Sequence, residues 1–346
     1  MQKLIQHLKD GAALDAAGIS EVTNGLLDET VETQSKVDLL KALHEKGETP
    51  EEIAGFVEAF LEHAVIPELD RTAMPGPLID VCGTGGDKLN LFNVSTTSMF
   101  VLAAGGATVV KHGNRGITSK SGGADVLEAL GIDIEMGPNN FAQCVATTGV
   151  GFLFAPRYHP AFKAVVPVRK ILAEQGQRTI FNILGPLLNP TRPDYQLVGV
   201  FDPNLPPVFA KILQKLGRKR AWAVHGTTSD GRGVDEMSTM GPTRIHEATP
   251  EGLREETIDA ESLGLAPARP EELQGTDAAG NAETLAGILN GDIVDGRRDL
   301  VLLNAAAGFA ITGRSEDLAS GLVLAAELID SGAATEKLRA LQTYAF

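Results

Sequence analysis

The chain has 346 residues, 43% of them apolar, which is enough for two domains or one large α/β domain with a sizeable core. The net charge of −15 disfavours nonspecific nucleic-acid binding, and the two cysteines are too few for a disulfide framework. The charged N-terminal residues do not resemble a signal peptide, and no apolar run approaches the ~20 residues of a membrane span. We therefore expect a cytoplasmic globular protein that binds neither a membrane nor nucleic acid.

The first seventy residues have the apolar spacing of amphipathic helices. The sequence Thr49-Pro50-Glu51-Glu52 is a capping box with proline at the first helical position, and apolar residues follow at helical spacing as far as Leu61. Similar patterns surround residues 4–8, 19–27 and 37–44. The pattern predicts a small all-helical domain over residues 1–70, followed by a proline-rich linker over 67–77.

Residues 75–346 alternate between short β-branched runs and amphipathic segments. This alternation predicts a large α/β domain with a mostly parallel central sheet covered by helices on both faces. Strands are expected at residues 78–82, 107–111, 132–135, 151–154, 196–201 and 220–225, with an edge strand at 244–248. Helices are expected at residues 94–104, 122–130, 206–216, 282–289, 300–312 and 317–331. Residues 260–280, rich in Ala, Pro, Gly and charge, are expected to form an exposed connection.

A glycine-rich and locally basic run covers residues 80–125. Its first turn, Gly83-Thr84-Gly85-Gly86-Asp87, follows an expected strand, and the missing Cβ atoms would let backbone N–H groups approach an anion. Asn93-Val94-Ser95-Thr96 then provides polar side chains where a helix begins and its dipole favours phosphate. The next strand leads into Lys111-His112-Gly113-Asn114-Arg115. Residues 81–124 contain four Lys or Arg and one acidic residue, a local charge of 4 − 1 = +3, which predicts a site for a multiply phosphorylated ligand.

Two common classes of phosphate-binding protein do not fit this run. It contains no Gly-x-x-x-x-Gly-Lys-Ser/Thr pattern, and no Gly-x-Gly-x-x-Gly followed about twenty residues later by an acidic residue. A nucleoside triphosphatase and a dinucleotide oxidoreductase are therefore disfavoured. One short glycine cluster is usually an ordinary turn, but two strand-to-helix turns, each followed by polar or basic side chains, favour phosphate binding.

These two loops, together with later motifs, resemble the anthranilate phosphoribosyltransferase family of tryptophan biosynthesis. The later motifs are Pro156-Arg157-Tyr158-His159-Pro160, then Arg178-Thr179-Ile180-Phe181-Asn182-Ile183-Leu184-Gly185-Pro186-Leu187 with Asn189-Pro190, and finally Val224-His225-Gly226 leading to Asp235-Glu236. The resemblance extends over nearly the whole chain. It implies a homodimer, a small helical domain that the helices near 160–190 would join, and a large phosphoribosyl-binding domain over residues 75–346.

The resemblance also implies a reaction. The enzyme would be a pentosyl (glycosyl) transferase that moves the 5-phosphoribosyl group of 5-phosphoribosyl 1-diphosphate to the amine of anthranilate and releases pyrophosphate. No covalent nucleophile is expected, because positioning and electrostatic stabilisation carry a step in which the ribose gains positive charge and the leaving group negative charge. Mg²⁺ is the implied cofactor, as two ions, one of them carried with the diphosphate substrate.

The resemblance assigns the site residues to three groups. The diphosphate substrate would be bound by Gly83, Gly86, Asp87, Asn93, Val94, Ser95, Thr96, Lys111, His112, Gly113, Asn114, Arg115, Ser119 and Gly123. Anthranilate would be bound by Gly83, His112, Asn114, Arg169 and Pro186, where the guanidinium suits a planar carboxylate. The metal ligands would be Ser95, Asp235 and Glu236, whose hard oxygen atoms suit Mg²⁺.

Two alternative functions are kept. A pyrimidine nucleoside phosphorylase is similar in fold and binds phosphate at a glycine-rich loop, but a Lys-x-Ser pattern would be expected where this chain has Lys111-His112-Gly113. A relative that has lost catalysis and binds nucleic acid should have a basic surface and altered loops. This chain is acidic and retains Gly83-Thr84-Gly85-Gly86-Asp87 and Asp235-Glu236.

Overall fold

The structure is a computed structural model that describes residues 1–116 and 120–344. The chain divides into two compact units. A helical unit contains Met1–Ile66 and Pro156–Pro190, and an α/β unit contains Pro67–Ala155 and Thr191–Phe346. The predicted fold class, a small helical part and a large α/β part with a mostly parallel sheet, is confirmed.

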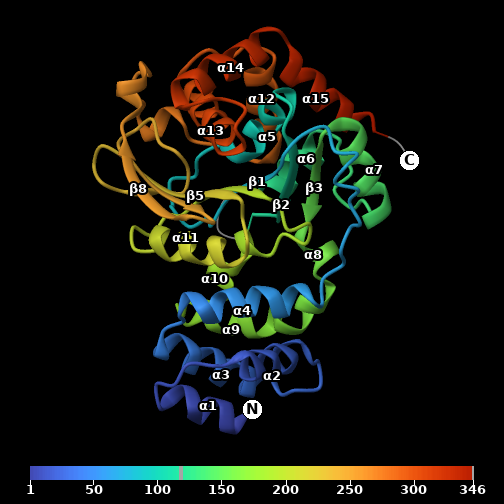
Figure 1. The fold of residues 1–346 in the computed structure, drawn as a ribbon, viewed down its shortest axis with the longest axis vertical. Coiled ribbons are helices and arrows are strands. Elements are labelled where there is room, and N and C mark those ends of the chain that lie inside the picture. Colours follow the sequence, from blue (N-terminus) through green and yellow to red (C-terminus); the bar gives the residue numbers. More distant parts are fainter. Residues whose placement is uncertain (117–119, 345–346) are drawn as a thin grey trace. The chain divides into compact units, whose positions relative to one another are not determined.

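The helical unit is built on four N-terminal helices and a later segment of short helices (Figure 1). The N-terminal helices are α1 (Gln2–Lys9), α2 (Ala16–Leu27), α3 (Thr33–Lys46) and α4 (Pro50–Leu61). The later segment contains α8 (Ala155–Tyr158), a 3-10 helix (Pro160–Val165), α9 (Val166–Glu174), α10 (Phe181–Leu184) and a second 3-10 helix (Gly185–Leu187). Helix α1 packs on α3, α2 on α4, and α3 on α9.

Helix α4 begins with the capping box that the sequence predicts. The Thr49 hydroxyl accepts a hydrogen bond from the Glu52 N–H at 3.1 Å, and the Glu52 carboxylate accepts one from the Thr49 N–H at 3.0 Å. The same carboxylate accepts the Leu14 N–H at 2.9 Å and pairs with Lys46 Nζ at 2.6 Å. Glu52 therefore joins the start of α4 to the end of α3 and to the loop before α2.

Aromatic packing explains why residues 156–190 belong to the helical unit. The Phe60 ring on α4 lies 5.1 Å from the Phe162 ring and 5.6 Å from the Phe181 ring, centroid to centroid. Lys36 on α3 also donates to the Ala164 carbonyl at 3.3 Å. Large buried rings dominate the energetics of such contacts, so this cluster fastens the later segment to the N-terminal helices.

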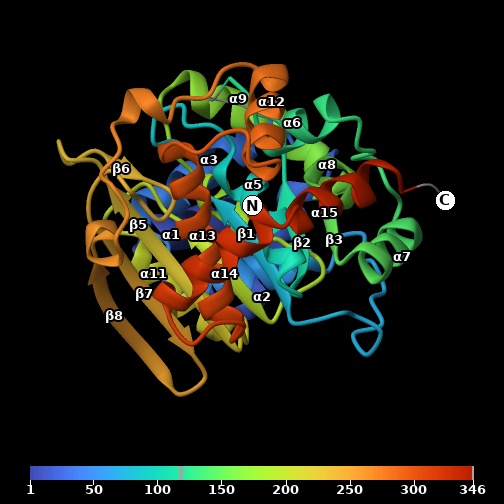
Figure 2. The ribbon, with the colours of Figure 1, turned by 90° about the horizontal axis from the view of Figure 1, so that it is seen from above.

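The α/β unit is organised around one eight-stranded sheet in the order β3-β2-β1-β4-β5-β7-β8, with β6 paired to β5. Strands β1 to β5 are parallel to their neighbours, whereas β6, β7 and β8 are antiparallel. Strands β3 and β8 lie at opposite edges (Figure 2). The bounds are β1 (Leu78–Gly83), β2 (Thr108–Gly113), β3 (Val150–Phe154), β4 (Tyr195–Gly199), β5 (Arg220–Thr227), β6 (Gly233–Val234), β7 (Thr243–Thr249) and β8 (Gly252–Ile258).

Helices cover the sheet. Helix α5 (Val94–Ala104) packs on β1 and β2, and α13 (Gly296–Thr312) packs on β4 and β5. Helices α14 (Leu318–Asp330) and α15 (Ala333–Gln342) lie against α13 and α5 on this side. Helix α11 (Pro206–Lys215) covers the other side of β5 and β7 (Figure 1). The remaining helices are α6 (Gly123–Ala129), α7 (Pro138–Thr148) and α12 (Ala278–Leu289).

Three details differ from the sequence-based expectations. Residues 132–135 do not form a strand, because the Asp133 side chain accepts the Glu135 N–H at 2.8 Å in a tight turn. Strand β8 was not predicted. Its five central residues are all exposed, so its sequence lacks the alternation of apolar and polar residues that identifies a half-buried strand. Residues 260–280 are not simply an exposed connection, since Leu273 is fully buried and pairs with Phe92.

Helix length and composition bear on whether the chain could span a membrane. Within residues 1–116 and 120–344, no single helix is long and apolar enough to cross one. Helices α14 and α15 reach the required length and composition only as a pair bent by 62°.

Candidate functional site

The site residues of the α/β unit lie where parallel strands end. Strand β1 runs into the first glycine turn, and β2 ends with Lys111-His112-Gly113. Strands β4 and β5 end beside the loop that carries Asp235 and Glu236. Ligands of open α/β sheets bind outside the carboxyl ends of the strands, so the topology places the predicted residues at the expected edge.

The first glycine turn has the backbone conformation that its sequence predicts. Gly85 and Gly86 have φ values of 72° and 94°, a region that other residues rarely adopt. The Thr84 N–H donates to the Gly199 carbonyl at 2.9 Å, and the Gly85 N–H donates to the Asp235 carboxylate at 2.6 Å. The turn is therefore fixed on one side to β4 and on the other to the acidic segment.

Glycines at the ends of three neighbouring strands make room for that acidic segment. A Cβ atom built on Gly83 would overlap the Asp235 side chain, and one built on Gly199 would overlap the Asp235 carbonyl. A Cβ atom on Gly226 would lie 2.5 Å from the Glu236 carbonyl oxygen. Sequence reasoning assigned Gly83 to the site, named Gly226 only as part of a motif, and missed Gly199, whose signal was a glycine at the end of a buried strand.

Three carboxyl groups, those of Asp87, Asp235 and Glu236, gather at this point. Burial, followed by the nearby Asp87 charge, raises the pKa of Asp235 to about 7, and burial with the Asp235 charge raises the pKa of Glu236 to about 8. Burial also raises the pKa of Asp87, whose carboxyl group is hydrogen-bonded to that of Asp235. All three residues are half-buried, and acids of like charge held this close favour a cation or a proton, so their chemistry fits a divalent metal.

The described residues contain no group of three or more His, Cys, Asp or Glu side chains that could hold a metal ion by themselves. Proteins usually hold Mg²⁺ through one or two carboxylates together with water and substrate phosphates. Substrate oxygens would have to complete the coordination.

Ser95 and Lys111 lie beside the carboxyl groups. The Ser95 N–H, in the first turn of α5, donates to the Glu236 carboxylate. Lys111 is almost fully buried, and its ammonium donates to the Ser95 hydroxyl at 3.0 Å and to the Val81 carbonyl at 2.5 Å. Its positive charge opposes the rise in the pKa of Glu236. The structure therefore brings together a hydroxyl, an ammonium and the acidic segment.

The second loop is fixed from both sides. The His112 N–H donates to the buried Asp80 carboxylate at 3.2 Å. Asp125 on α6 accepts the N–H groups of Gly116 and Gly122, each at 2.8 Å, and so closes the loop across its ends. Gly123 allows α6 to approach α5, because a Cβ atom there would lie 2.9 Å from the Thr96 hydroxyl.

The Arg115 side chain in the second loop is ion-paired. Its guanidinium pairs with Glu128 at 2.6 and 3.0 Å and with Asp125 at 3.3 Å, and it lies over the Phe154 ring. The Arg115 N–H donates to the Asn114 side chain at 2.8 Å. These bonds use three of the five guanidinium N–H groups, so a phosphate would bind through the other two or take the place of a carboxylate.

Two predicted anthranilate residues, Arg169 and Pro186, belong to the helical unit. Arg169 lies on α9 with its guanidinium 5.6 Å from the centre of the Phe181 ring, and burial lowers its pKa. Pro186 lies in the 3-10 helix that follows α10. Ser119, predicted to bind the diphosphate substrate, lies outside the described residues.

Asn304 on α13 is a site-supporting residue that sequence reasoning missed. Its side-chain oxygen accepts the Met237 N–H at 3.0 Å and its NH₂ group donates to the Met237 carbonyl at 3.0 Å. The side chain is 1% exposed. It therefore holds the backbone directly after Glu236, and its signal was a single amide within the apolar run of α13.

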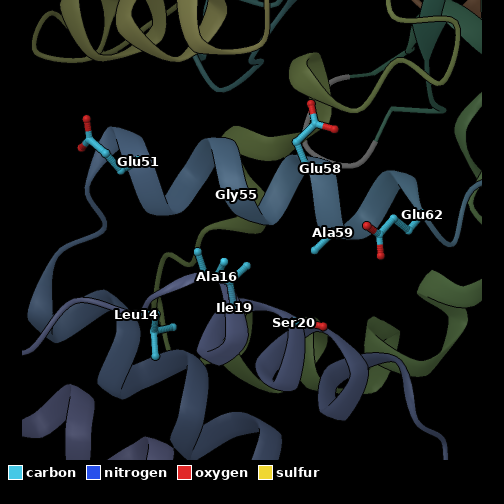
Figure 3. Close-up of a pocket in the computed structure, with 9 residues that line it drawn as sticks. All are labelled: Leu14, Ala16, Ile19, Ser20, Glu51, Gly55, Glu58, Ala59 and Glu62. Carbon is cyan, nitrogen blue, oxygen red and sulfur yellow. The ribbon is translucent and has the colours of Figure 1, made fainter.

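The helical unit also has a pocket of about 400 Å³ between α2 and α4 (Figure 3). Its lining is apolar except for Ser20 and three glutamates, Glu51, Glu58 and Glu62. Such a lining does not favour an anionic substrate, so the pocket is not a candidate for the phosphate site.

Comparisons with known proteins agree with this geometry. Residues 75–335 match the glycosyl transferase family, a/b domain, and residues 2–64 match the glycosyl transferase family, helical bundle domain. This chain therefore belongs to the glycosyl transferase family.

Individual relatives are more specific. Anthranilate phosphoribosyltransferase from Haloferax volcanii is 42% identical over 342 residues, 99% of each chain, and that from Geobacter sulfurreducens is 42% identical over 353 residues, also 99% of each. The crystal structure of the Thermus thermophilus enzyme has a TM-score of 0.88 at 38% identity and covers 98% of both chains. The Saccharomyces cerevisiae enzyme in complex with PRPP and Mg has a TM-score of 0.85 at 26% identity, covering 98% of this chain and 97% of that chain. This chain belongs to the anthranilate phosphoribosyltransferase family, and the resemblance in its sequence is confirmed.

Proposed function

We propose that the protein transfers the 5-phosphoribosyl group of 5-phosphoribosyl 1-diphosphate to the amine of anthranilate, with release of pyrophosphate, in tryptophan biosynthesis. A C–N bond forms at C1 of the ribose as the C1–O bond to diphosphate breaks, and the nitrogen then loses a proton. The observation that carries this proposal is the glycine turn of β1 bonded directly to the acidic segment, with Gly85 N–H on Asp235 at 2.6 Å.

The residues of this site suit stabilisation of a leaving diphosphate. Backbone N–H groups of the turn and the N-terminus of α5 favour phosphate oxygens. The Lys111 ammonium adds a buried positive charge beside Ser95. Because charge develops on both fragments during the reaction, preorganised dipoles and charges lower the barrier without a covalent intermediate. This supports the assignment of the turn, Asn93 to Thr96 and the second loop to the diphosphate substrate.

We propose Mg²⁺ as the cofactor, held by Ser95, Asp235 and Glu236, in two ions of which one arrives with the substrate. The raised pKa values of both carboxyl groups support this, since a divalent cation would favour their ionised form. Mg²⁺ would supply charge neutralisation of the diphosphate. The Saccharomyces cerevisiae relative was solved with PRPP and Mg.

For anthranilate we propose Arg169 as the partner of the carboxylate, with Gly83, His112, Asn114 and Pro186 completing the set. A largely buried guanidinium whose pKa is lowered by burial gains from an anionic ligand. The Saccharomyces cerevisiae relative was also solved with 4-fluoroanthranilate. Replacing Arg169 by Ala should raise KM for anthranilate more than KM for the diphosphate substrate, whereas replacing its exposed neighbour Lys170 should change neither.

The function is tested by mixing the purified protein with 5-phosphoribosyl 1-diphosphate, Mg²⁺ and anthranilate and following anthranilate fluorescence. We expect the fluorescence to fall with time in proportion to enzyme concentration. A constant signal at every enzyme concentration would refute the proposal. Thymidine with phosphate in a parallel reaction tests pyrimidine nucleoside phosphorolysis, and binding to a duplex oligonucleotide tests the nucleic-acid alternative; we expect neither.

We further propose that the protein acts in the cytoplasm as a homodimer. The low cysteine content supports a reducing compartment, since Cys82 and Cys144 are both buried thiols that form no disulfide. The dimer is implied by the family.

A further inference from the structure

Asn281 on α12 is a buried amide that the proposed chemistry does not use. Its side chain is 3% exposed. Its oxygen accepts the Thr276 N–H at 2.8 Å, and its NH₂ group donates to the side-chain oxygen of Asn93 at 2.9 Å. Asn93 stands immediately before α5, in the motif assigned to the diphosphate substrate. The contact joins residues 188 positions apart in the chain.

The backbone around this contact is built to bring the two amides together. The Phe92 N–H donates to the Leu273 carbonyl at 3.1 Å, and the Gly275 N–H donates to the Asn90 carbonyl at 2.7 Å. A Cβ atom on Gly275 would lie 2.8 Å from the Asn281 side-chain oxygen and 2.9 Å from the Phe92 Cα. Any other residue at 275 would therefore push Asn281 away from the loop that carries Asn93.

Asn93 does not use its side chain in the usual way for its position. An asparagine before a helix commonly accepts a backbone N–H of the first turn, but Asn93 makes no such cap. Its oxygen instead accepts from Asn281, and its NH₂ group donates to the Ser121 carbonyl at 3.3 Å. Asn93 thus connects α12 to the loop before α6.

The direction of these hydrogen bonds is fixed at both ends. The Thr276 N–H can only donate, so the Asn281 oxygen must face it and the Asn281 NH₂ group must face Asn93. The Ser121 carbonyl can only accept, so the Asn93 NH₂ group must face it. Both ends require the same orientation of Asn93, with its oxygen toward α12 and its NH₂ group toward the second loop.

We propose that Asn281 is a positioning residue for the diphosphate substrate. By holding the oxygen of Asn93, it makes that amide present N–H groups, and not a carbonyl oxygen, on the side of the second loop. One of these two N–H groups is taken by Ser121 among the described residues, which leaves the other for a ligand oxygen. A reversed Asn93 would turn a partial negative charge toward an anion. The proposal rests on the proposed function, because it assigns the anion as 5-phosphoribosyl 1-diphosphate.

The test is Asn281→Asp, which keeps the shape of the side chain and the acceptor for Thr276 but removes the donor to Asn93. We expect KM for 5-phosphoribosyl 1-diphosphate to rise roughly tenfold, because one buried hydrogen bond is replaced by two facing acceptors. The KM for anthranilate should change less than about twofold. Calorimetric binding of the diphosphate substrate with Mg²⁺, without anthranilate, should weaken by the same factor.

Asn290→Asp is the matched control, because it makes the same change at the other end of α12. Asn290 accepts the Thr335 hydroxyl at 3.1 Å, a role that a carboxylate retains. We expect both KM values to stay at those of the unmodified protein. If Asn281→Asp does not fold, Asn281→Ala removes the donor without adding charge and is measured in the same way.

Each result has one meaning. Unchanged affinity for the diphosphate substrate in a folded Asn281 variant overturns the proposal. A lower kcat and a lower melting temperature with both KM values unchanged also overturn it, because that combination indicates a structural role only. Failure of the unmodified protein to consume anthranilate or to bind 5-phosphoribosyl 1-diphosphate would instead refute the proposed function. An equal rise in both KM values contradicts a specific effect on Asn93.

Discussion

At the scale of the residue, the position of the acidic segment depends on glycines that have no side chain to contribute. Gly83 and Gly199 end two adjacent strands, Gly226 is the last residue but one of the next strand, and each lies against the backbone or side chain of Asp235 or Glu236. A loop can cross the edge of a sheet only where the residues at the strand ends leave it room. The positions of the two carboxyl groups therefore depend partly on the absence of Cβ atoms at these three glycines.

Replacing Gly199 by Ala should disturb this geometry directly. The new Cβ atom would overlap the Asp235 carbonyl, so the acidic segment must move. We expect kcat/KM to fall by at least about a hundredfold, because an ångström of misplacement in a catalytic group is that costly. Steady-state kinetics measure the change. Gly296→Ala, whose Cβ atom would have its nearest neighbour at 3.3 Å, is the control and should retain activity.

The raised pKa values at Asp235 and Glu236 predict an unusual dependence of stability on pH. Each carboxyl group binds its proton more tightly in the folded protein than in the unfolded chain, where acids titrate near 4. Their contribution to stability is therefore fully present below about pH 4 and is lost as the pH rises through about 7 to 8. Without Mg²⁺, the melting temperature should fall across this window.

The double variant Asp235→Asn, Glu236→Gln separates this effect from all other titrations. Its melting temperature should fall less between pH 5 and pH 8 than that of the unmodified protein, and Mg²⁺ should stabilise it less at pH 8. Thermal unfolding followed by circular dichroism measures both quantities. Parallel curves for the two proteins would show that these carboxyl groups titrate normally.

Residue-scale prediction from the sequence selected side chains that carry their own chemistry. Lys111, Ser95 and the two carboxyl groups lie close together in the structure, and their roles stay predictions. Gly199 and Asn304 could not be found, because a glycine at a strand end and an amide in an apolar helix each have several ordinary explanations until the fold supplies their neighbours.

At the scale of the element, Glu52, the acidic member of the capping box of α4, also contacts two other segments of the helical unit. The Glu52 carboxylate is bonded to Lys46 and to two backbone N–H groups, those of Leu14 and Thr49. Both side chains of the ion pair are almost completely buried. Removing one partner of such a pair leaves an uncompensated charge and unpaired donors.

Glu52→Ala should therefore destabilise the helical unit by roughly 3 kcal/mol. Glu51→Ala, on the exposed side of the same turn, should change the free energy of unfolding by less than about 0.5 kcal/mol. Urea unfolding followed by circular dichroism compares the two variants. Similar midpoints for both would contradict a joining role for Glu52.

Element prediction from the sequence followed the strength of the local pattern. The five parallel strands were found because each is a buried apolar run between glycine or proline signals. Residues 132–135 have a similar composition, but no strand in the described part of the chain pairs with them, and Asp133 closes a turn instead. Pairing is a tertiary property, so a single short run does not determine it.

At the scale of the whole molecule, the proposed dimer gives a direct expectation. The chain has a mass of 36.5 kDa, so light scattering after size-exclusion chromatography should give twice that mass. Dilution to nanomolar concentration should leave the mass unchanged if the interface is of the obligate kind. A mass of one chain at every concentration would exclude the dimer.

The helical unit is assembled from two stretches of chain, Met1–Ile66 and Pro156–Pro190. A truncated protein that begins at Pro67 would keep Phe162 and Phe181 while removing Phe60, their ring partner. The unit therefore cannot be cut off, shuffled or exchanged as one block of sequence. A chimaera between two members of the family would have to transplant both stretches together, and recombination at Ile66 alone should yield mismatched aromatic partners even when each parent folds.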